Sequence, residues 1–150
     1  MISIDVKQNI NAGPSHIREV LLEHEKLERY FNAEFTLLKK QNEGEIKGGK
    51  GAVRQISMMG ISFEEMIVSA DNNHINYRII GNKPVADHRG YIHFSQNNGS
   101  NKTVTEVSYN ISCKSPWWLP SFFLSYVIKK DITQALKKLA VSFDENSQCL

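Results

Sequence analysis

The sequence has little cysteine, little net charge and no long apolar run, and each shortage excludes a class of protein. The two cysteines, Cys113 and Cys149, are too few for a disulfide framework, and neither belongs to a Cys-x-x-Cys or Cys/His pattern typical of zinc. Eighteen Lys and Arg against 16 Asp and Glu give a net charge of +2, which disfavours nucleic acid as a partner. The densest apolar stretch, Trp117 to Ile128, is too short to span a bilayer.

What remains is a chain of ordinary globular composition. Hydrophobic residues make up 41% and charged residues 23% of the sequence, which is typical of soluble domains. A chain of 150 residues suits one domain with its own hydrophobic core. Its first residues alternate apolar and polar side chains, with charges among them, unlike a signal peptide. We therefore expect a single domain over residues 1–150, cytoplasmic, as a monomer or a homodimer.

The beginning of the chain predicts a strand followed by two short helices. Apolar and polar residues alternate over Ile2–Ile10, which is typical of a half-buried strand. Gly13 and Pro14 then supply a cap and a first helical residue. Apolar residues keep helical spacing up to about Phe31, but the charged interruption at Glu23-His24-Glu25 divides them into two short helices.

From Glu34 onward the apolar period changes to two, so the middle of the chain predicts a series of strands. Asn98-Gly99 is a strong hairpin signal within this series. The short turns imply a curved antiparallel sheet that has seven strands when the first is counted. The six further strands are expected at Phe35–Lys40, Ala52–Met58, Ile61–Ser69, Ile75–Gly81, about Ala86–Gln96 and Thr103–Cys113.

After Pro116 the sequence predicts one long helix, roughly from Pro120 to Phe143. Its apolar residues fall within about 120° of one another at 100° per residue, which gives one continuous stripe to bury. Lys130 and Lys137 lie on the opposite side. The stripe consists of Leu124, Ile128, Ile132, Ala135, Leu136, Leu139 and Phe143.

Several local patterns accompany this order of elements. They are Ile10-Asn11-Ala12-Gly13-Pro14 followed by Val20-Leu21, Gly51-x-x-Arg54, Phe63-x-Glu65-x-Ile67, Ile75-x-Tyr77 and Thr103-x-Thr105-x-Val107-x-Tyr109. From Ile4 to about Phe143, order and patterns together resemble the START-related, birch-pollen-allergen-like (SRPBCC) superfamily, in particular its polyketide cyclase/dehydrase branch. The resemblance implies an α+β helix-grip fold, in which the sheet wraps around the C-terminal helix and leaves a mostly apolar cavity. It also implies a hydrophobic small-molecule or lipid binder more often than an enzyme.

Strand alternation assigns a few polar side chains to the face that meets the long helix. On the last strand, Tyr109 shares a face with Val107 and Ile111. The same rule on the other strands gives the inward polar residues Arg54, Glu65, Tyr77 and His88. With their apolar neighbours, the residues expected to line the cavity are Arg54, Phe63, Glu65, Tyr77, His88, Ile92, Tyr109, Leu124 and Ile128.

The inward polar residues have two interpretations. Buried charges need partners, because desolvating an unpaired charge costs several kcal/mol. In the first interpretation Arg54 and Glu65 form an ion pair between neighbouring strands, and the tyrosines and His88 bond to the wall. In the second, Arg54 holds a ligand carboxylate or phenolate, His88 carries a proton and Glu65 orients either group. His88 and Glu65 are the best catalytic candidates.

The histidines do not indicate a metal site. His88 and His93 lie five positions apart on one strand and face opposite sides of the sheet, so they do not bind one ion together. His16, His24 and His74 fall in a helix, at the helix interruption and in a turn, without ligand spacing. We expect neither a metal nor a cofactor.

The apolar segment that begins the long helix has more large side chains than one stripe can bury. Its aromatic residues are expected at a cavity entrance or an interface, which could be a dimer contact or a membrane edge with Lys129 and Lys130 nearby for anionic headgroups. They are Trp117, Trp118, Phe122, Phe123 and Tyr126.

The sequence thus leaves three hypotheses. The first is binding of a hydrophobic or amphipathic small molecule, such as a lipid, a quinone or a polyketide-like compound, in the central cavity. The second is a cyclase/dehydrase-like enzyme that uses His88, Glu65 and Arg54. The third is a protein that contacts a partner or the membrane surface through the Trp117–Tyr126 edge.

Overall fold

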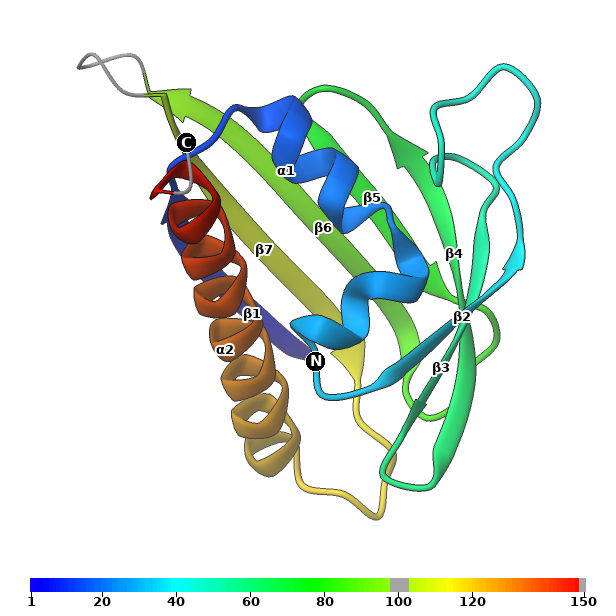
Figure 1. Ribbon diagram of the computed structural model, residues 1–150. Coiled ribbons are helices and arrows are strands. Elements are labelled where there is room, and N and C mark those ends of the chain that lie inside the picture. Colours follow the sequence, from blue (N-terminus) through cyan, green and yellow to red (C-terminus); the bar gives the residue numbers. More distant parts are fainter. Residues whose placement is uncertain (98–102, 149–150) are drawn as a thin grey trace.

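The structure, a computed structural model, describes residues 1–97 and 103–148. The predicted Asn98-Gly99 turn and Cys149 lie outside the described residues. Within this part of the chain, seven antiparallel strands form one curved sheet, and three helical segments lie on its concave face (Figure 1). This is the α+β helix-grip arrangement that the sequence predicts.

The elements follow the predicted order of a strand, two short helices, six strands and a long helix. The strands are β1 (Ile2–Ile10), β2 (Glu34–Lys39), β3 (Val53–Met58), β4 (Ile61–Ala70), β5 (His74–Ile79), β6 (Ala86–Asn97) and β7 (Val104–Lys114). The helices are α1 (Pro14–Leu21), the 3₁₀-helix η1 (His24–Arg29) and α2 (Ser121–Gln148).

The sheet has the order β1-β7-β6-β5-β4-β3-β2. Strands β2 to β6 each pair with the next strand in the sequence, as short connections favour. The first strand closes this series by pairing antiparallel with β7, in a register that runs from Ile2 opposite Cys113 to Ile10 opposite Thr105. This pairing brings the two ends of the chain's strand series together beneath α2.

The period-two pattern of the strands decides which face is buried. On β5, Ile75, Tyr77 and Ile79 are buried, whereas Arg78 between them is exposed. Because successive side chains point to opposite faces, each strand turns its apolar set toward the helices. The polar residues of the same strands form the outer, convex face.

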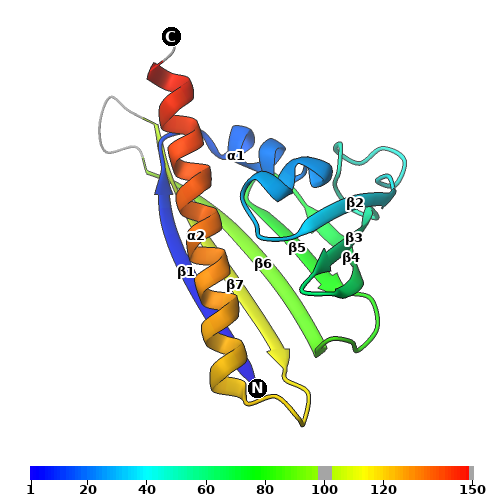
Figure 2. The same cartoon turned by 60° about the horizontal axis from the view of Figure 1, so that its bottom comes forward.

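The two helical regions cover different parts of the concave face. Helix α2 packs along β1 and buries Ile132 and Leu136 there. Helix α1 crosses the end of the sheet that is far from the first turns of α2 (Figures 1 and 2). Leu124 and Ile128 in these first turns are consequently only partly buried, although they belong to the predicted stripe.

Apart from strand ends that shift by one or two residues, the structure differs from the predicted elements in two places. The second short helix is a 3₁₀-helix, and α2 continues to Gln148, beyond the predicted end at Phe143. The apolar stripe stops at Phe143, but neither Gly nor Pro follows to end the helix there. The apolar period therefore marks the end of the apolar stripe and not the end of the helix.

A bulge interrupts the β6–β7 register beside His88. Asp87 has a positive φ of 50°, and the register shifts between Ala86 and Arg89. His88 nevertheless faces inward beside Tyr77, on the same side of β6 as the buried Gly90 and Ile92, as strand alternation predicts.

Gly90 makes room for a buried tyrosine on the neighbouring strand. Tyr77 and Gly90 are directly opposite in the β5–β6 register. A Cβ atom at Gly90 would lie only 2.2 Å from Cζ of Tyr77, because the tyrosine ring lies across the glycine. The ring therefore reaches β7 only because position 90 has no side chain.

We predict that Gly90→Ala lowers the free energy of unfolding by about 1–3 kcal/mol, the usual cost of overpacking a rigid site. The added methyl group must displace the Tyr77 ring. Gly13→Ala is the matched control, because its Cβ would meet no atom closer than 3.8 Å. Urea unfolding of both variants measures the effect, and equal stability of the two would contradict this role of Gly90.

Candidate functional site

A cavity of about 460 Å³ lies between the concave face of the sheet, the α1–η1 segment and the first half of α2. Its walls are mostly apolar and come from strands β3 to β7 as well as from α2. All the residues expected to line a cavity lie along it, namely Arg54, Phe63, Glu65, Tyr77, His88, Ile92, Tyr109, Leu124 and Ile128. Their contact with a ligand stays a prediction.

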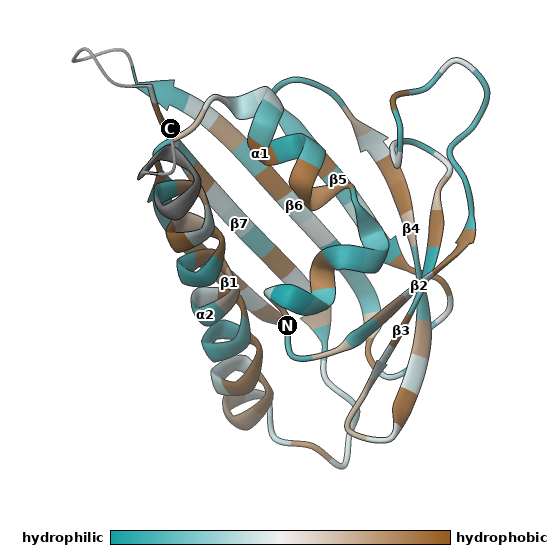
Figure 3. Ribbon diagram, in the orientation of Figure 1, coloured by the Kyte–Doolittle hydropathy of each residue, from teal (hydrophilic) through white to brown (hydrophobic). Residues whose placement is uncertain are grey.

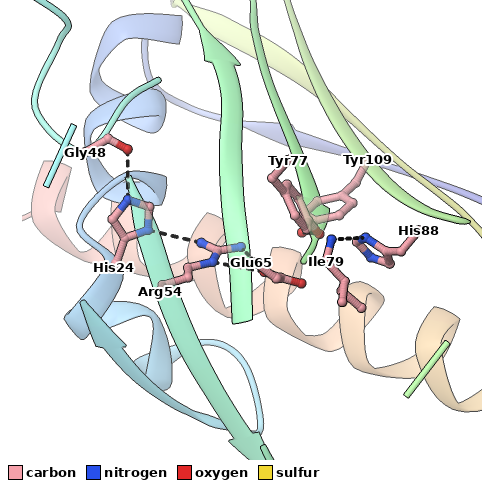
Figure 4. Close-up of polar contacts among 8 residues, drawn as sticks. All are labelled: His24, Gly48, Arg54, Glu65, Tyr77, Ile79, His88 and Tyr109. Atoms are coloured by element: carbon pink, nitrogen blue, oxygen red, sulfur yellow. Dashed lines mark hydrogen bonds and ion pairs between the residues drawn. The ribbon is translucent and has the colours of Figure 1, made fainter. Parts of the chain in front are cut away.

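A buried ion pair forms the polar part of the wall. Arg54 and Glu65 are direct partners in the β3–β4 register and are only 6% and 5% exposed. Nε and Nη2 of Arg54 donate hydrogen bonds of 3.0 and 2.7 Å to Oε1 of Glu65 (Figure 4). The ion pair of the first interpretation is therefore present.

Two aromatic rings enclose the guanidinium of Arg54. Its Cζ lies 5.3 Å from the ring centre of Phe35 and 5.0 Å from that of Tyr77, both within cation–π range. Burial opposes the charge, but Glu65 and the two tyrosines outweigh it and raise the pKa of Arg54. Arg54 is thus a charged and fully engaged residue, which leaves little of it for a ligand carboxylate.

His24 links this ion pair to the loop before β3. Its Nε2 lies 2.8 Å from the carbonyl oxygen of Gly48, and its Nδ1 lies 3.2 Å from Nη1 of Arg54. A carbonyl only accepts and a guanidinium only donates, so the ring carries its proton on Nε2 and is neutral. Burial, followed by the charge of Arg54, lowers the pKa of His24 to about 4.

The two inward tyrosines share a hydrogen bond at the other side of Glu65. The hydroxyl groups of Tyr77 and Tyr109 contact each other, and Figure 4 shows the Glu65 carboxylate between Arg54 and this pair. Burial raises the pKa of both phenols well above the ordinary value. Both tyrosines are therefore protonated at neutral pH, and one of the two hydroxyl protons is not used within the pair.

His88 offers a hydrogen-bond donor to the cavity. Its Nδ1 accepts the backbone N–H of Ile79 at 3.2 Å, so the proton of the neutral ring is on Nε2. Burial lowers the pKa of His88, which favours this neutral form. Nε2 has no hydrogen bond to any other residue that the structure describes. Proton transfer by His88 and Glu65 stays a prediction.

Asp131 on α2 is a second carboxylate in the cavity wall. One of its oxygens, Oδ1, accepts the backbone N–H of Asn32 at 3.4 Å. Burial raises the pKa of Asp131. Asp131 is thus a partly desolvated carboxylate on an otherwise apolar helix face. It adds one polar group from α2 to those that the strands contribute to the cavity wall.

The aromatic segment before and within the first turns of α2 divides into two groups. Trp118 and Phe123 line the cavity at its mouth, together with Met59 and Ile61 from the β3–β4 turn. The others, Trp117, Phe122 and Tyr126, are exposed and do not line it. An open groove beside η1 shares Met59 and Ile61 with the cavity and widens this mouth.

Two polar residues of this region were not among the predicted site residues. His24 lies at the predicted helix interruption, and no local pattern there indicates that its side chain turns inward to Arg54. Asp131, in contrast, left a signal. It lies three residues after Ile128 and four before Ala135, so it shares their helix face and interrupts the apolar stripe.

No three His, Cys, Asp or Glu side chains of residues 1–97 and 103–144 gather closely enough to hold a metal ion. Among the helices that the structure describes, none is both long and apolar enough to cross a membrane.

Comparisons with known proteins agree with this geometry. The family described as "Polyketide cyclase / dehydrase and lipid transport" matches residues 1–143. Among solved structures, XoxI from Bacillus cereus is similar with a TM-score of 0.73 at 15% identity, over 98% of this chain and 99% of that one. A START superfamily protein from Mycobacterium smegmatis is similar with a TM-score of 0.69 at 14% identity, over 95% of this chain and 97% of that one. A search of curated proteins found no match.

We predict that His24 makes the protein less stable to unfolding in mild acid. The folded state binds a proton on His24 only near pH 4, whereas an unfolded histidine does so near 6.5. Stability from His24 is therefore complete above pH 6.5 and is lost as the pH falls toward 4, by on the order of 3 kcal/mol.

The matched variants are His24→Gln and His16→Gln. Glutamine at position 24 retains one donor for Gly48 and one acceptor for Arg54 but does not titrate. Between pH 6.5 and 4, the unfolding free energy of His24→Gln should depend less on pH than that of the wild type. His16→Gln changes an exposed residue, and its unfolding free energy should follow that of the wild type. Parallel pH profiles for all three proteins would show that His24 is not the titrating group.

Proposed function

The chain belongs to the polyketide cyclase/dehydrase and lipid transport family, and from this membership and its cavity we propose that it binds a hydrophobic or amphipathic small molecule between the sheet and α2. A lipid, a quinone and a polyketide-like compound all fit this description. The family and the fold support a hydrophobic ligand-binding domain, and the cavity supplies the place.

An apolar space between the sheet and α2, which the chain does not fill, supports this proposal most directly. Protein interiors pack as densely as organic crystals and leave few voids larger than a water molecule. A cavity of about 460 Å³ instead falls within the range of roughly 300–1,000 Å³ that is usual for ligand pockets. The partly buried Leu124 and Ile128 border this space.

In our proposal the Arg54–Glu65 ion pair has a structural role in the wall of this pocket. Arg54 is bonded to Glu65 and His24 and enclosed by two rings, so it joins β3 to η1, β2, β4 and β5. The polar groups that remain for a ligand are those of Glu65, His88, Asp131 and the tyrosine pair. Such an arrangement, apolar walls with a few convergent polar groups, is typical of sites that bind small organic molecules.

We predict that Ile128→Trp reduces ligand binding at least about tenfold, because the larger ring occupies the cavity. Val141→Trp is the matched control, since Val141 is exposed on the same helix outside the cavity. Fluorescence titration with a neutral probe, N-phenyl-naphthylamine, measures binding, and native mass spectrometry of purified protein detects a co-purified ligand. Equal probe affinity of both variants, or no saturable binding to the wild type, would overturn the proposal.

A membrane surface is a second proposed partner, and the composition of the cavity mouth favours it. Trp118 and Phe123 on one side and Met59 on the other are exposed around the opening. Met59 lies in the β3–β4 turn, Trp118 in the β7–α2 loop and Phe123 in the first turn of α2. These segments lie at the same end of the molecule (Figure 1), and the first turns of α2 are largely hydrophobic (Figure 3). Exposed Lys129 and Lys130 follow on α2 and suit anionic headgroups.

We predict that the double variant Trp118→Ser, Phe123→Ser loses most of its binding to vesicles of phosphatidylcholine and phosphatidylserine, because the apolar contacts at the mouth are removed. Val141→Ser, which removes an exposed apolar side chain from the other half of α2, should bind as the wild type does. Sedimentation with vesicles measures the bound fraction. If the wild-type protein stayed in the supernatant, the membrane hypothesis would be contradicted, whereas the proposal of ligand binding in the cavity would be unaffected.

A further inference from the structure

The charges around the cavity limit which head group a ligand can have. Among the described residues that line it, Arg54 is the one permanent cation, and its side chain already makes two hydrogen bonds to Glu65 and one to His24. His88 is neutral, because Nδ1 accepts a backbone N–H. The carboxylates of Glu65 and Asp131 complete the charged groups of the wall. The described lining therefore carries no unpaired positive charge.

The groups left for a ligand include acceptors and donors. Both bonds from Arg54 end on Oε1 of Glu65, so Oε2 accepts no hydrogen bond from the described residues. Oδ2 of Asp131 is likewise left as an acceptor, since Asn32 bonds Oδ1. The donors are Nε2–H of His88 and one hydroxyl proton of the Tyr77–Tyr109 pair.

A hydroxyl group satisfies both kinds of partner with the fewest atoms, because it donates one hydrogen bond and accepts others. A ligand carboxylate would instead be desolvated beside two protein carboxylates without a free cation, which costs several kcal/mol. An ether would accept from the donors but leave the carboxylates unbonded.

We propose that this cavity selects neutral amphiphiles with a hydroxyl head group, an alcohol or a phenol, over fatty acids of the same length. The inference rests on the proposed ligand-binding function and names the class of ligand. It predicts a preference that the shape of an apolar cavity alone does not give, because the competing molecules differ only at the head.

The test is displacement of bound N-phenyl-naphthylamine from the wild-type protein at neutral pH by decanol, decanoate and decyl methyl ether. Decanol should displace the probe at a concentration at least about tenfold lower than decanoate, and the ether should fall between them. Displacement by decanoate at the same concentration as decanol, or at a lower one, would overturn the inference. So would failure of decanol to displace a probe that binds.

The Asp131→Asn variant tests the cause of the preference. Asparagine retains an acceptor for the N–H of Asn32 but removes the negative charge from the wall. The ratio between decanoate and decanol should narrow by roughly threefold to tenfold, while decanol itself changes little. Asp5→Asn is the matched control, because Asp5 is exposed on the convex face of β1. An unchanged ratio in Asp131→Asn would contradict the electrostatic cause.

The outcomes separate this inference from the proposed function. If the probe does not bind the wild type, the cavity is not a ligand site and both proposals fail. If the probe binds and Ile128→Trp abolishes its binding, the pocket stands. The head-group series then decides the ligand class alone.

Discussion

The charge of Arg54 is the constraint on which the rest of the site depends. A guanidinium that is 6% exposed in an apolar wall must be neutralised and enclosed, because an unpaired buried charge costs several kcal/mol. Glu65 neutralises it, His24 bonds it, and Phe35 and Tyr77 cover it. Each of these partners comes from a different element, so the charge ties the η1 segment, β2, β4 and β5 to β3.

The same constraint propagates to positions that bear no charge. Tyr77 covers Arg54 only because Gly90 leaves room for its ring, and His24 accepts from Arg54 only because its other nitrogen bonds Gly48. Gly48 in turn has a φ of +76°, and a Cβ there would lie 2.3 Å from the carbonyl oxygen of Leu22. Two glycines therefore support the ion pair, for steric reasons that differ.

A wall whose cation is already paired leaves a cavity that is apolar and not positively charged. Polar groups converge on it from the strands, and Asp131 adds one from α2. At the mouth of the cavity, in contrast, the large apolar side chains are exposed to solvent. Our two proposals fit together for this reason. A neutral amphiphile partitions both into an apolar cavity and into the lipid surface that the exposed mouth would contact.

Local patterns were enough to predict the order of the elements and the inward face of each strand. They also placed the polar side chains of Arg54, Glu65, Tyr77, His88 and Tyr109 on that face. Periods of two and 3.6 residues follow from local backbone geometry and are visible in any one segment. Asp131 was also readable, as a break in the apolar stripe. Three features became visible only in the folded structure. His24 bonds to Arg54, Trp118 and Phe123 line the mouth of the cavity whereas Trp117 does not, and the cavity between the sheet and α2 is left unfilled. These depend on the packing of segments that are distant in the chain, because partners and cavities arise between elements and not within them.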